Sequence, residues 1–218
     1  QAGLPVPQPI DLYFDDSGHC VDYLAAVFIQ GDGAIVLENE IGRVVRQLHV
    51  IPPPAFIPVA QRLDTLEETL ADLILRRSEV IERMSGRFLA IPSRETLALC
   101  LHWSPRRRSL LHMDVRQDNI IGVNGRVLAL IDWSNVLVGP PALELCRVAE
   151  YGLLSPAFRR GYGDDPLENT PSRVLLAYRL YTATMLAVVF LSEAPDPVRA
   201  AKAVDRVGEL YEQLRELT

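Results

Sequence analysis

The sequence predicts an α+β protein in which a short strand-forming segment precedes a mostly helical body that contains one β-hairpin. Strand-like apolar runs bounded by turn residues occupy the chain up to Gly33. Beyond Gly33, apolar residues recur with the period of an α-helix. The dipeptide Asn124-Gly125 separates two further strand-like runs and is the strongest hairpin signal in the chain. With 49% hydrophobic and 23% charged residues among 218, the chain can bury a core.

The front of the chain is expected to be extended. Prolines at positions 5, 7 and 9 forbid an early helix, and strands are expected over residues 10–14 and 23–29. A proline cluster that ends the first helix predicts a stiff linker, and it consists of Pro52, Pro53, Pro54 and Pro58. Helices are expected where apolar residues repeat with helical spacing between breakers, over residues 37–50, 63–84, 94–102, 142–151, 171–191 and 197–217.

One expected helix raises the question of a membrane. Residues 174–191 form an apolar run of 18 residues, which touches the length needed to span a bilayer. Arg179 near the centre of the run, with Thr182 and Thr184, argues against contact with lipid. We therefore expect a helix buried in a soluble core, and no membrane partner.

Composition narrows the classes of function. The net charge of −6 argues against a dedicated nucleic-acid binder, whose footprint is a basic face. Cys20, Cys100 and Cys146 are widely spaced and fit neither a disulfide framework nor a zinc site, so we expect reduced thiols in a cytoplasmic protein. Of the 22 basic residues only Lys202 is a lysine, which excludes any mechanism that needs a lysine elsewhere in this chain.

Three polar residues flank the predicted hairpin. Asp114 and Asn119 precede its first strand and Asp132 follows its second, so the returning chain should bring the three side chains to one spot. Two carboxylates and an amide oxygen form a set of hard ligands that suits Mg²⁺, which usually takes its remaining ligands from water and substrate phosphates. The alternative is that the aspartates are turn residues and Asn119 caps a strand end.

The motif around this hairpin resembles a known family. His-x-Asp-x-x-x-x-Asn at residues 112–119, a hairpin, and Ile-Asp-Trp at 131–133 resemble the aminoglycoside phosphotransferase and choline kinase-like branch of the protein-kinase fold. Residues 139–145 are similar to the family's Gly-Asp-Pro-x-x-Asp-Leu stretch, and the segment 41–49 to its first C-lobe helix. The resemblance implies a partial N-lobe with the hinge over residues 1–36 and a helical C-lobe over 37–218.

The resemblance also implies roles for individual residues. Asp114 corresponds to the catalytic base that accepts the proton of the attacking hydroxyl group, and Asn119 and Asp132 correspond to the ligands of Mg²⁺. His112 corresponds to a histidine that shapes the loop. The spacing of Arg116 from Asp114 suits a cation that steadies the transferring phosphoryl group, although a solvent-exposed arginine is equally compatible.

The implied nucleotide is ATP, with GTP not excluded. Val27, Phe28 and Ile29 fall where the family's hinge backbone meets adenine. The glycine-rich loop and the lysine strand of the family are expected upstream of Gln1, and an intact mass well above 24.3 kDa would support this. The sequence departs from the family at Pro140 and Glu144, where an aspartate is usual, so the loop after Asp132 is expected to be held differently.

The leading hypothesis is an ATP-dependent phosphotransferase that acts on a hydroxyl group of a small molecule, an aminoglycoside or another antibiotic or metabolite. The alternative is a kinase-like module that binds a nucleotide or small molecule without catalysis. A helical protein with no nucleotide would require the polar set to be accidental. Acidic residues over 161–168 and 193–196 suit a cationic substrate by attraction or an ordinary solvated loop. The sequence indicates no oligomeric state.

Overall fold

The computed structural model describes residues 3–14, 21–52, 66–103 and 108–217. The expected α+β class is observed, because helices dominate the described part and the strands form three two-stranded pairs. The elements, in chain order, are β1 (Pro9–Phe14), β2 (Val21–Ala26), α1 (Glu38–Val50), α2 (Leu66–Ser85), α3 (Arg94–Leu101), β3 (Ser109–Leu111), β4 (Ile120–Val123), β5 (Arg126–Leu130), β6 (Leu137–Gly139), α4 (Pro141–Glu150), α5 (Pro156–Tyr162), α6 (Ser172–Val188) and α7 (Pro197–Glu216).

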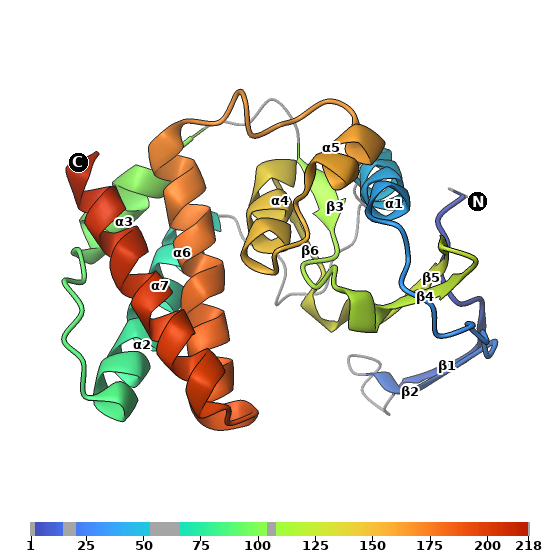
Figure 1. Ribbon diagram of the computed structural model, residues 1–218, viewed down its shortest axis with the longest axis horizontal. Coiled ribbons are helices and arrows are strands. Elements are labelled where there is room, and N and C mark those ends of the chain that lie inside the picture. Colours follow the sequence, from blue (N-terminus) through green and yellow to red (C-terminus); the bar gives the residue numbers. More distant parts are fainter. Residues whose placement is uncertain (1–2, 15–20, 53–65, 104–107, 218) are drawn as a thin grey trace.

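The antiparallel pair β1–β2 lies at one end of the molecule, and α2, α3 and α7 lie at the other (Figure 1). The second strand ends at Ala26 and not at residue 29 as expected. Beyond it the amide of Val27 still donates to the Gln8 carbonyl at 2.8 Å, and the chain then crosses to β4, where the amide of Asp32 donates to the Gly122 carbonyl at 3.1 Å. The segment after β2 therefore connects the first hairpin to the second.

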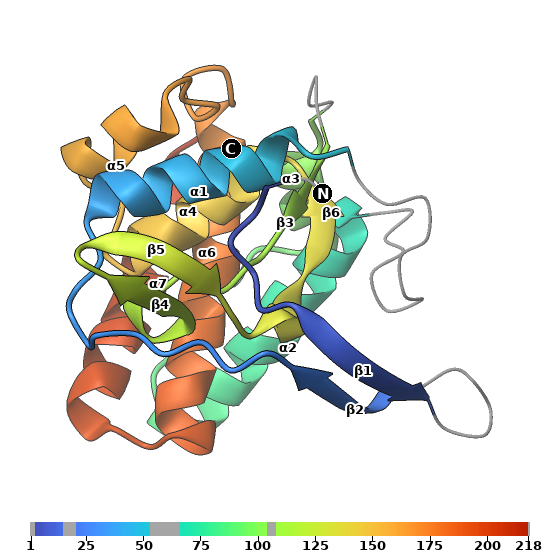
Figure 2. The ribbon, with the colours of Figure 1, turned by 90° about the vertical axis from the view of Figure 1, so that its right-hand side faces the viewer.

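The hairpin β4–β5 forms where the Asn-Gly dipeptide predicts it (Figure 2). Asn124 and Gly125 have φ angles of 52° and 76°, the left-handed values that a tight two-residue hairpin turn needs. Leu37 packs on this turn, and its amide donates to the Gly125 carbonyl at 3.0 Å just before α1 begins. The pair β3–β6 was not expected as a sheet, because β6 has only three residues and carries no period.

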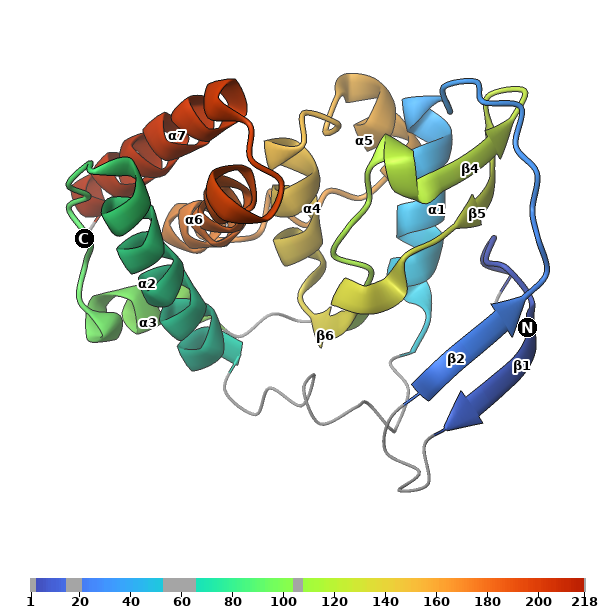
Figure 3. The same cartoon turned by 90° about the horizontal axis from the view of Figure 1, so that it is seen from below.

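The long apolar helix α6 is the centre of the helical body and packs against α2, α3, α4 and α7 (Figure 3). Leu143 of α4, Leu180 of α6 and Leu210 of α7 are fully buried in the main core. Among the described residues, the stretch Ser172–Glu193 is the one helix long and apolar enough to cross a membrane by length and composition, and half of it is buried within the protein. Its apolar character therefore serves packing in this fold.

A second apolar cluster lies between α1, α4, α5 and the β4–β5 hairpin. Ile41, Val115, Ile120, Leu145 and Phe158 contribute to it and are buried. Val115 directly follows Asp114, so the packing of Val115 in this cluster fixes the backbone of the polar loop. The position of the predicted site is thus set by core packing on both of its flanks.

Helix α5 was not expected, and it corrects the interpretation of residues 161–165 as a loop at 161 and 162, while 163–165 lie outside the helix. Gly161 and Tyr162 are its last residues, and Tyr162 is buried. A methyl group on Gly161 would collide with the Asn39 carbonyl and one on Gly42 with the Phe158 carbonyl, so the two glycines allow α1 and α5 to pack backbone to backbone. Seven residues are too few for a helical period to stand out in the sequence.

The other expected helices are confirmed, with changes at their ends. The helix expected over 171–191 ends at Val188 and continues as a single π-helical turn, Val189–Glu193. Ser93 caps α3 through its side chain, and Asp196 caps α7 in the same way. Part of the expected proline linker and the start of the helix expected from Leu63 lie outside the described residues, as does Cys20.

Candidate active site

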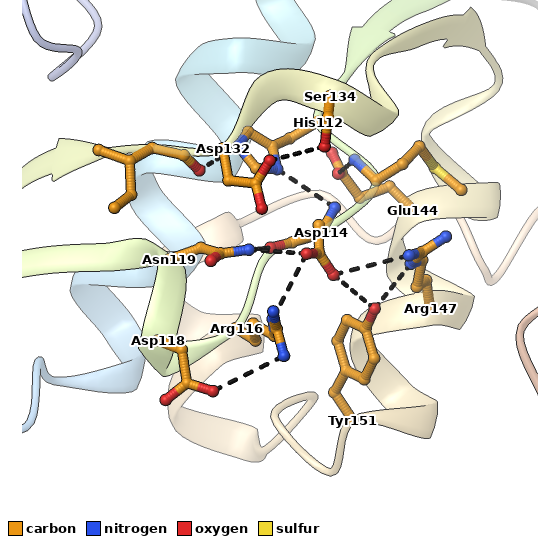
Figure 4. Close-up of polar contacts among 12 residues, drawn as sticks. His112, Asp114, Arg116, Asp118, Asn119, Asp132, Ser134, Glu144, Arg147 and Tyr151 are labelled. Atoms are coloured by element: carbon orange, nitrogen blue, oxygen red, sulfur yellow. Dashed lines mark hydrogen bonds and ion pairs between the residues drawn. The ribbon is translucent and has the colours of Figure 1, made fainter. Parts of the chain in front are cut away.

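Asp114 and Asn119 lie on the loop between β3 and β4, and Asp132 lies just beyond the end of β5 (Figure 4). The loop turns sharply at Met113, whose φ of 62° is in the left-handed region that L-residues rarely adopt. The carboxylate of Glu144 on α4 accepts a hydrogen bond from the Met113 amide. This hydrogen bond stabilises the strained turn, and Asp114 is the residue that follows it.

Asp114 is the centre of the hydrogen-bond network. Its carboxylate Oδ2 accepts from Asn119 Nδ2 at 2.7 Å, and its Oδ1 accepts from the Tyr151 hydroxyl at 2.6 Å. Arg147 lies 3.6 Å from Oδ1 and also donates to the Tyr151 hydroxyl at 2.9 Å. Asp114 is 6% exposed, so these partners and not water determine its charge state.

The environment of Asp114 keeps its carboxylate ionised. Burial opposes ionisation, but the Tyr151 hydroxyl, the guanidinium groups of Arg147 and Arg116, and the Asn119 amide outweigh it and hold the pKa of Asp114 below its ordinary value. Burial, together with the Asp114 charge, raises the pKa of Tyr151 to about 12. The hydroxyl of Tyr151 therefore stays protonated and donates to the carboxylate.

His112 connects the loop to the residue before Asp132. Its Nδ1 accepts from the Asp114 amide at 3.2 Å, and its Nε2 donates to the Ile131 carbonyl at 3.0 Å. Burial lowers the pKa of His112, which agrees with a neutral ring that accepts at one nitrogen and donates at the other. The ring also packs edge-on against Trp133 with centroids 4.5 Å apart. These contacts favour the structural role expected for His112.

Asn119 and Asp132 lie next to each other, as the hairpin geometry predicts (Figure 4). The Ile131 amide donates to the Asn119 carbonyl at 3.0 Å, which ties the start of β4 to the residue preceding Asp132. Asp132 itself has a φ of 62° and a ψ of 71°. A left-handed conformation at a non-glycine residue costs energy and is concentrated at functional positions.

The oxygens of these two residues fit a cation. Asn119 Nδ2 donates to the main-chain and side-chain oxygens of Asp114, so the other amide atom of Asn119, Oδ1, points away from Asp114. Within the described chain no group forms a hydrogen bond to Asn119 Oδ1. Asp132 is exposed and accepts from Ser134 at 2.6 Å through one carboxylate oxygen only. No group of three His, Cys, Asp or Glu side chains in the described ranges is placed to hold a metal ion. A hard divalent cation here would need further oxygens from a ligand.

Arg116 lies at the mouth of the site. Its Nε is 3.4 Å from Asp114 Oδ2, and its Nη1 is 3.7 Å from Asp118. The side chain is nearly half exposed, so it can reach a bound anion. The buried Asp114 carboxylate would then still have Arg147 as a partner. Both interpretations from the sequence, a functional cation and a solvated one, are compatible with this position.

Of the three residues expected at the hinge, Ile29 alone lines a cavity of about 470 Å³, here named the Ile29 cavity. Ile29, Gly31 and Ile35 line it on one side and Gln117 and Ile121 on the other. Val27 and Phe28 are 44% and 85% exposed and do not line it. The Val27 amide is already bonded to Gln8, so backbone contacts of a ligand in this cavity would come from the residues after it.

A second cavity, of about 680 Å³, opens on the other side of Gln117 and is here named the Asp114 cavity. Asp114, Arg116 and Tyr151 line it near the loop, and α2, α6, the π-helical turn and α7 complete its wall. Gln117 lines both cavities. The ionised, buried Asp114 therefore lies close to the junction of two concave sites.

Sequence reasoning missed Arg147 and Tyr151. They are four residues apart, so both project from the same face at the end of α4 toward Asp114. Their spacing would have identified a shared helix face, but no local pattern connects that face with the loop. Lys202 lies on α7 and lines neither cavity.

Comparison with known proteins identifies the family and the fold. The phosphotransferase enzyme family matches residues 1–179 of the chain. No curated protein matches the sequence. Among solved structures, spectinomycin phosphotransferase APH(9)-Ia, in complex with ADP and spectinomycin, is 15% identical with a TM-score of 0.60, covering 98% of this chain and 79% of that one.

Two further structures have the same fold. Aminoglycoside phosphotransferase APH(4)-Ia is 16% identical with a TM-score of 0.61, over 97% of this chain and 78% of that one. A choline/ethanolamine kinase family protein from Mesorhizobium loti is 17% identical with a TM-score of 0.60, over 97% and 75%. The kinase-like fold that the motif around residues 112–133 implies is therefore confirmed.

Proposed function

The chain belongs to the phosphotransferase enzyme family, and we propose that it transfers the γ-phosphoryl group of ATP to a hydroxyl group of a small molecule, with Asp114 as the catalytic base. The observation that carries this proposal is the position of Asp114. It is buried, kept ionised, and lines the Asp114 cavity beside Gln117, which also lines the Ile29 cavity. A base in an acceptor site that adjoins a donor site supports phosphoryl transfer.

In the proposed reaction, the Asp114 carboxylate orients the hydroxyl group of the acceptor and takes its proton. The hydroxyl oxygen forms a bond to the γ-phosphorus as the bond from that phosphorus to the bridging oxygen of ADP breaks. ADP leaves with the bonding electrons, and the proton remains on Asp114 until solvent removes it. Tyr151 and Asn119 hold the two carboxylate oxygens in place, so little reorganisation is needed when the hydroxyl group arrives.

Asn119 Oδ1 and Asp132 are the groups proposed to hold Mg²⁺. The ion, when bound with the nucleotide, would neutralise charge on the phosphate oxygens. Arg116 is proposed to steady the transferring phosphoryl group, since it is a cation beside the base with an exposed guanidinium group. Its ion pair with Asp114 is loose enough, at 3.4 Å, to be shared with an anionic ligand.

The Ile29 cavity is the proposed nucleotide site, between residues 1–36 as the partial N-lobe with the hinge and 37–218 as the C-lobe. Apolar side chains of Ile29, Ile120 and Ile121 line it and suit the faces of a purine. The contacts expected from the hinge are made by backbone groups, so GTP is the alternative donor. The described thiols, Cys100 and Cys146, are free and buried, which accords with the proposed cytoplasmic location.

The test separates the base from the metal ligands. Asp114→Asn keeps the shape of the side chain and removes the base, so phosphoryl transfer should fall by about two to four powers of ten while nucleotide affinity changes little. Asp132→Asn should weaken magnesium-dependent nucleotide binding as well as the rate. Asp205→Asn, an exposed carboxylate on α7, is the control and should change neither quantity.

Transfer to a panel of alcohols and affinity for the nucleotide are measured for each variant. Equal transfer by Asp114→Asn and the unchanged protein would contradict the role of Asp114. Nucleotide binding without transfer to any alcohol would favour the non-catalytic binding module instead.

A further inference from the structure

The Asp114 cavity has an excess of positive charge. Arginines 77, 116, 147 and 199 line it, whereas Asp114 and Glu193 are the carboxylates among its lining residues. Of the acidic residues expected to attract a cationic substrate, Glu193 lines this cavity, whereas Asp164 pairs with Arg46 and Asp165 with Arg159. A polycation would therefore meet repulsion in this cavity.

Three of the four lining arginines form ion pairs. Arg147 and Arg116 both form ion pairs with Asp114, and Arg199 pairs with Asp196 at 3.5 Å. Arg77 differs from them, because it has no ion pair with any described residue. Among the described residues it is thus the lining arginine without an ion pair, and the Glu193 carboxylate lines the same cavity.

Arg77 is nevertheless held in place. Its Nη1 donates to the Tyr181 carbonyl at 3.1 Å, and its guanidinium carbon lies 4.7 Å from the centroid of the Tyr181 ring. These contacts fix the plane of the guanidinium group and leave its other N–H groups for a ligand. A fixed guanidinium fork binds a carboxylate through two parallel hydrogen bonds. The single guanidinium group of Arg77 supplies one positive charge, which suits the single charge of a carboxylate.

Part of the cavity lining is apolar. Met185 and Leu186 of α6, Val189 and Phe190 of the π-helical turn, and Leu153 form this part. Such side chains suit contact with the carbon chain of a ligand. In Figure 1, α2 lies beside α6 and away from β3, so Arg77 and the loop of Asp114 approach the cavity from different elements.

We propose that the acceptor is a hydroxy acid with an apolar carbon frame, whose carboxylate binds Arg77 and whose hydroxyl group meets Asp114. This inference rests on the proposed function and names its substrate class. The hydroxyl oxygen forms the new bond to the γ-phosphorus of ATP, the bond to ADP breaks, and the hydroxyl proton goes to Asp114. The products are a phospho-ester of the hydroxy acid and ADP.

The first experiment compares acceptors that share one carbon chain. 6-Hydroxyhexanoate, 6-hydroxyhexanamide and 6-amino-1-hexanol differ only at the end away from the hydroxyl group, and shorter and longer sets follow the same design. ADP formation gives kcat/KM for each with ATP and Mg²⁺. In the set with the best chain length, we expect kcat/KM for the hydroxy acid to exceed that for its amide by about 10- to 100-fold. This factor corresponds to the free energy of a hydrogen bond to a charged group. The amino alcohol and the polycation kanamycin should be the poorest acceptors.

The second experiment tests Arg77 itself. Arg77→Gln should lower kcat/KM for the hydroxy acid by a similar factor, mainly through KM, and leave the amide unchanged. Arg77→Lys keeps the charge but lacks the fork, and should recover part of the loss. Arg76→Gln removes the same charge from the adjacent, solvent-exposed position of α2 and should have no effect. Thermal unfolding of each variant shows whether it folds.

The outcomes separate this inference from the proposed function. Transfer to kanamycin or amino alcohols in preference to every hydroxy acid would overturn the inference and leave the phosphotransferase intact. If no alcohol is phosphorylated, the proposed function fails, and the inference is decided by whether 6-hydroxyhexanoate raises Tm in an Arg77-dependent way. Inorganic phosphate that competes through Arg77 more strongly than carboxylates do would also overturn it, in favour of a phosphorylated acceptor.

Discussion

Replacement of Tyr151 by phenylalanine tests how the protein controls the charge of Asp114. The ring is retained, including its position 5.7 Å from the Arg147 guanidinium carbon, and only the hydroxyl group is removed. That hydroxyl donates to Asp114 Oδ1 at 2.6 Å and is the leading favourable contribution to the lowered pKa of Asp114. The variant should therefore make Asp114 harder to ionise.

The magnitude follows from the geometry. A hydrogen bond to a charged, buried group is worth about 1.5–3 kcal/mol, and a change of one unit in a pKa corresponds to about 1.4 kcal/mol. Arg147 remains 3.6 Å from Asp114 and compensates in part. We expect the acid limb of the pH profile of kcat/KM to move upward by about one pH unit, with a much smaller change in rate on the alkaline side.

The assay measures phosphoryl transfer from pH 4 to pH 9 for the unchanged protein, Tyr151→Phe and Tyr211→Phe. Tyr211 is the matched control, since its hydroxyl forms a buried hydrogen bond with Ser78 at 2.6 Å in the core. Its loss should lower Tm without moving the acid limb. An acid limb that stays in place in Tyr151→Phe, or moves equally in the control, would refute the electrostatic role of Tyr151.

The same bond makes stability depend on pH. Because the pKa of Asp114 is lower in the folded than in the unfolded state, its ionised form stabilises the fold above the unfolded value, near pH 4. This stabilisation is lost as the pH falls through the folded-state pKa. Tyr151→Phe should lose Tm chiefly at neutral pH and approach the unchanged protein in acid, as thermal unfolding across pH would show.

Three further outcomes follow from the site and the fold. Mg²⁺ titrated into the nucleotide-free protein should bind weakly by calorimetry, because Asn119 and Asp132 supply too few oxygens on their own, and tight binding would indicate another kind of metal site. Arg116→Gln should lower kcat with little change in nucleotide affinity, and an unchanged kcat would identify Arg116 as a solvated surface residue. Gly161→Ala should lower the free energy of unfolding by about 1–3 kcal/mol in urea titrations, because the added methyl group meets the Asn39 carbonyl of α1.

The fold could be predicted from the sequence where the signals are local. Asn124-Gly125 specified the β4–β5 hairpin because few other dipeptides adopt two successive left-handed conformations without strain. The hairpin then made the proximity of Asn119 and Asp132 predictable. β6 and α5 were not predicted, because segments of three and seven residues are too short to show a period. Their placement also depends on partners distant in the chain.

The sequence predicted the candidate site residues that lie in one continuous segment, but not those that approach from elsewhere in the chain. Asp114, Asn119 and Asp132 belong to one continuous segment, whereas Tyr151 and Arg147 reach Asp114 from α4. Burial of Asp114 and the sign of its pKa shift depend on these tertiary contacts. The motif thus predicts candidate reacting groups, but their electrostatics come from a helix that the motif does not contain.

Glu144 stands where the family usually has an aspartate, and the loop geometry accommodates this longer side chain. Glu144 is fully buried, and its two oxygens have separate tasks: one accepts from the Met113 amide and the other lies 2.7 Å from His49 Nε2. His49 is held in turn by the Tyr162 hydroxyl at 2.8 Å. The carboxylate is thereby fixed from α1 and α5 while it supports the strained turn before Asp114. Because a buried carboxylate is tolerated only when its oxygens are bonded, the longer side chain and its histidine partner form one unit. The close packing of α1 against α5 through Gly42 and Gly161 is what brings that partner within reach.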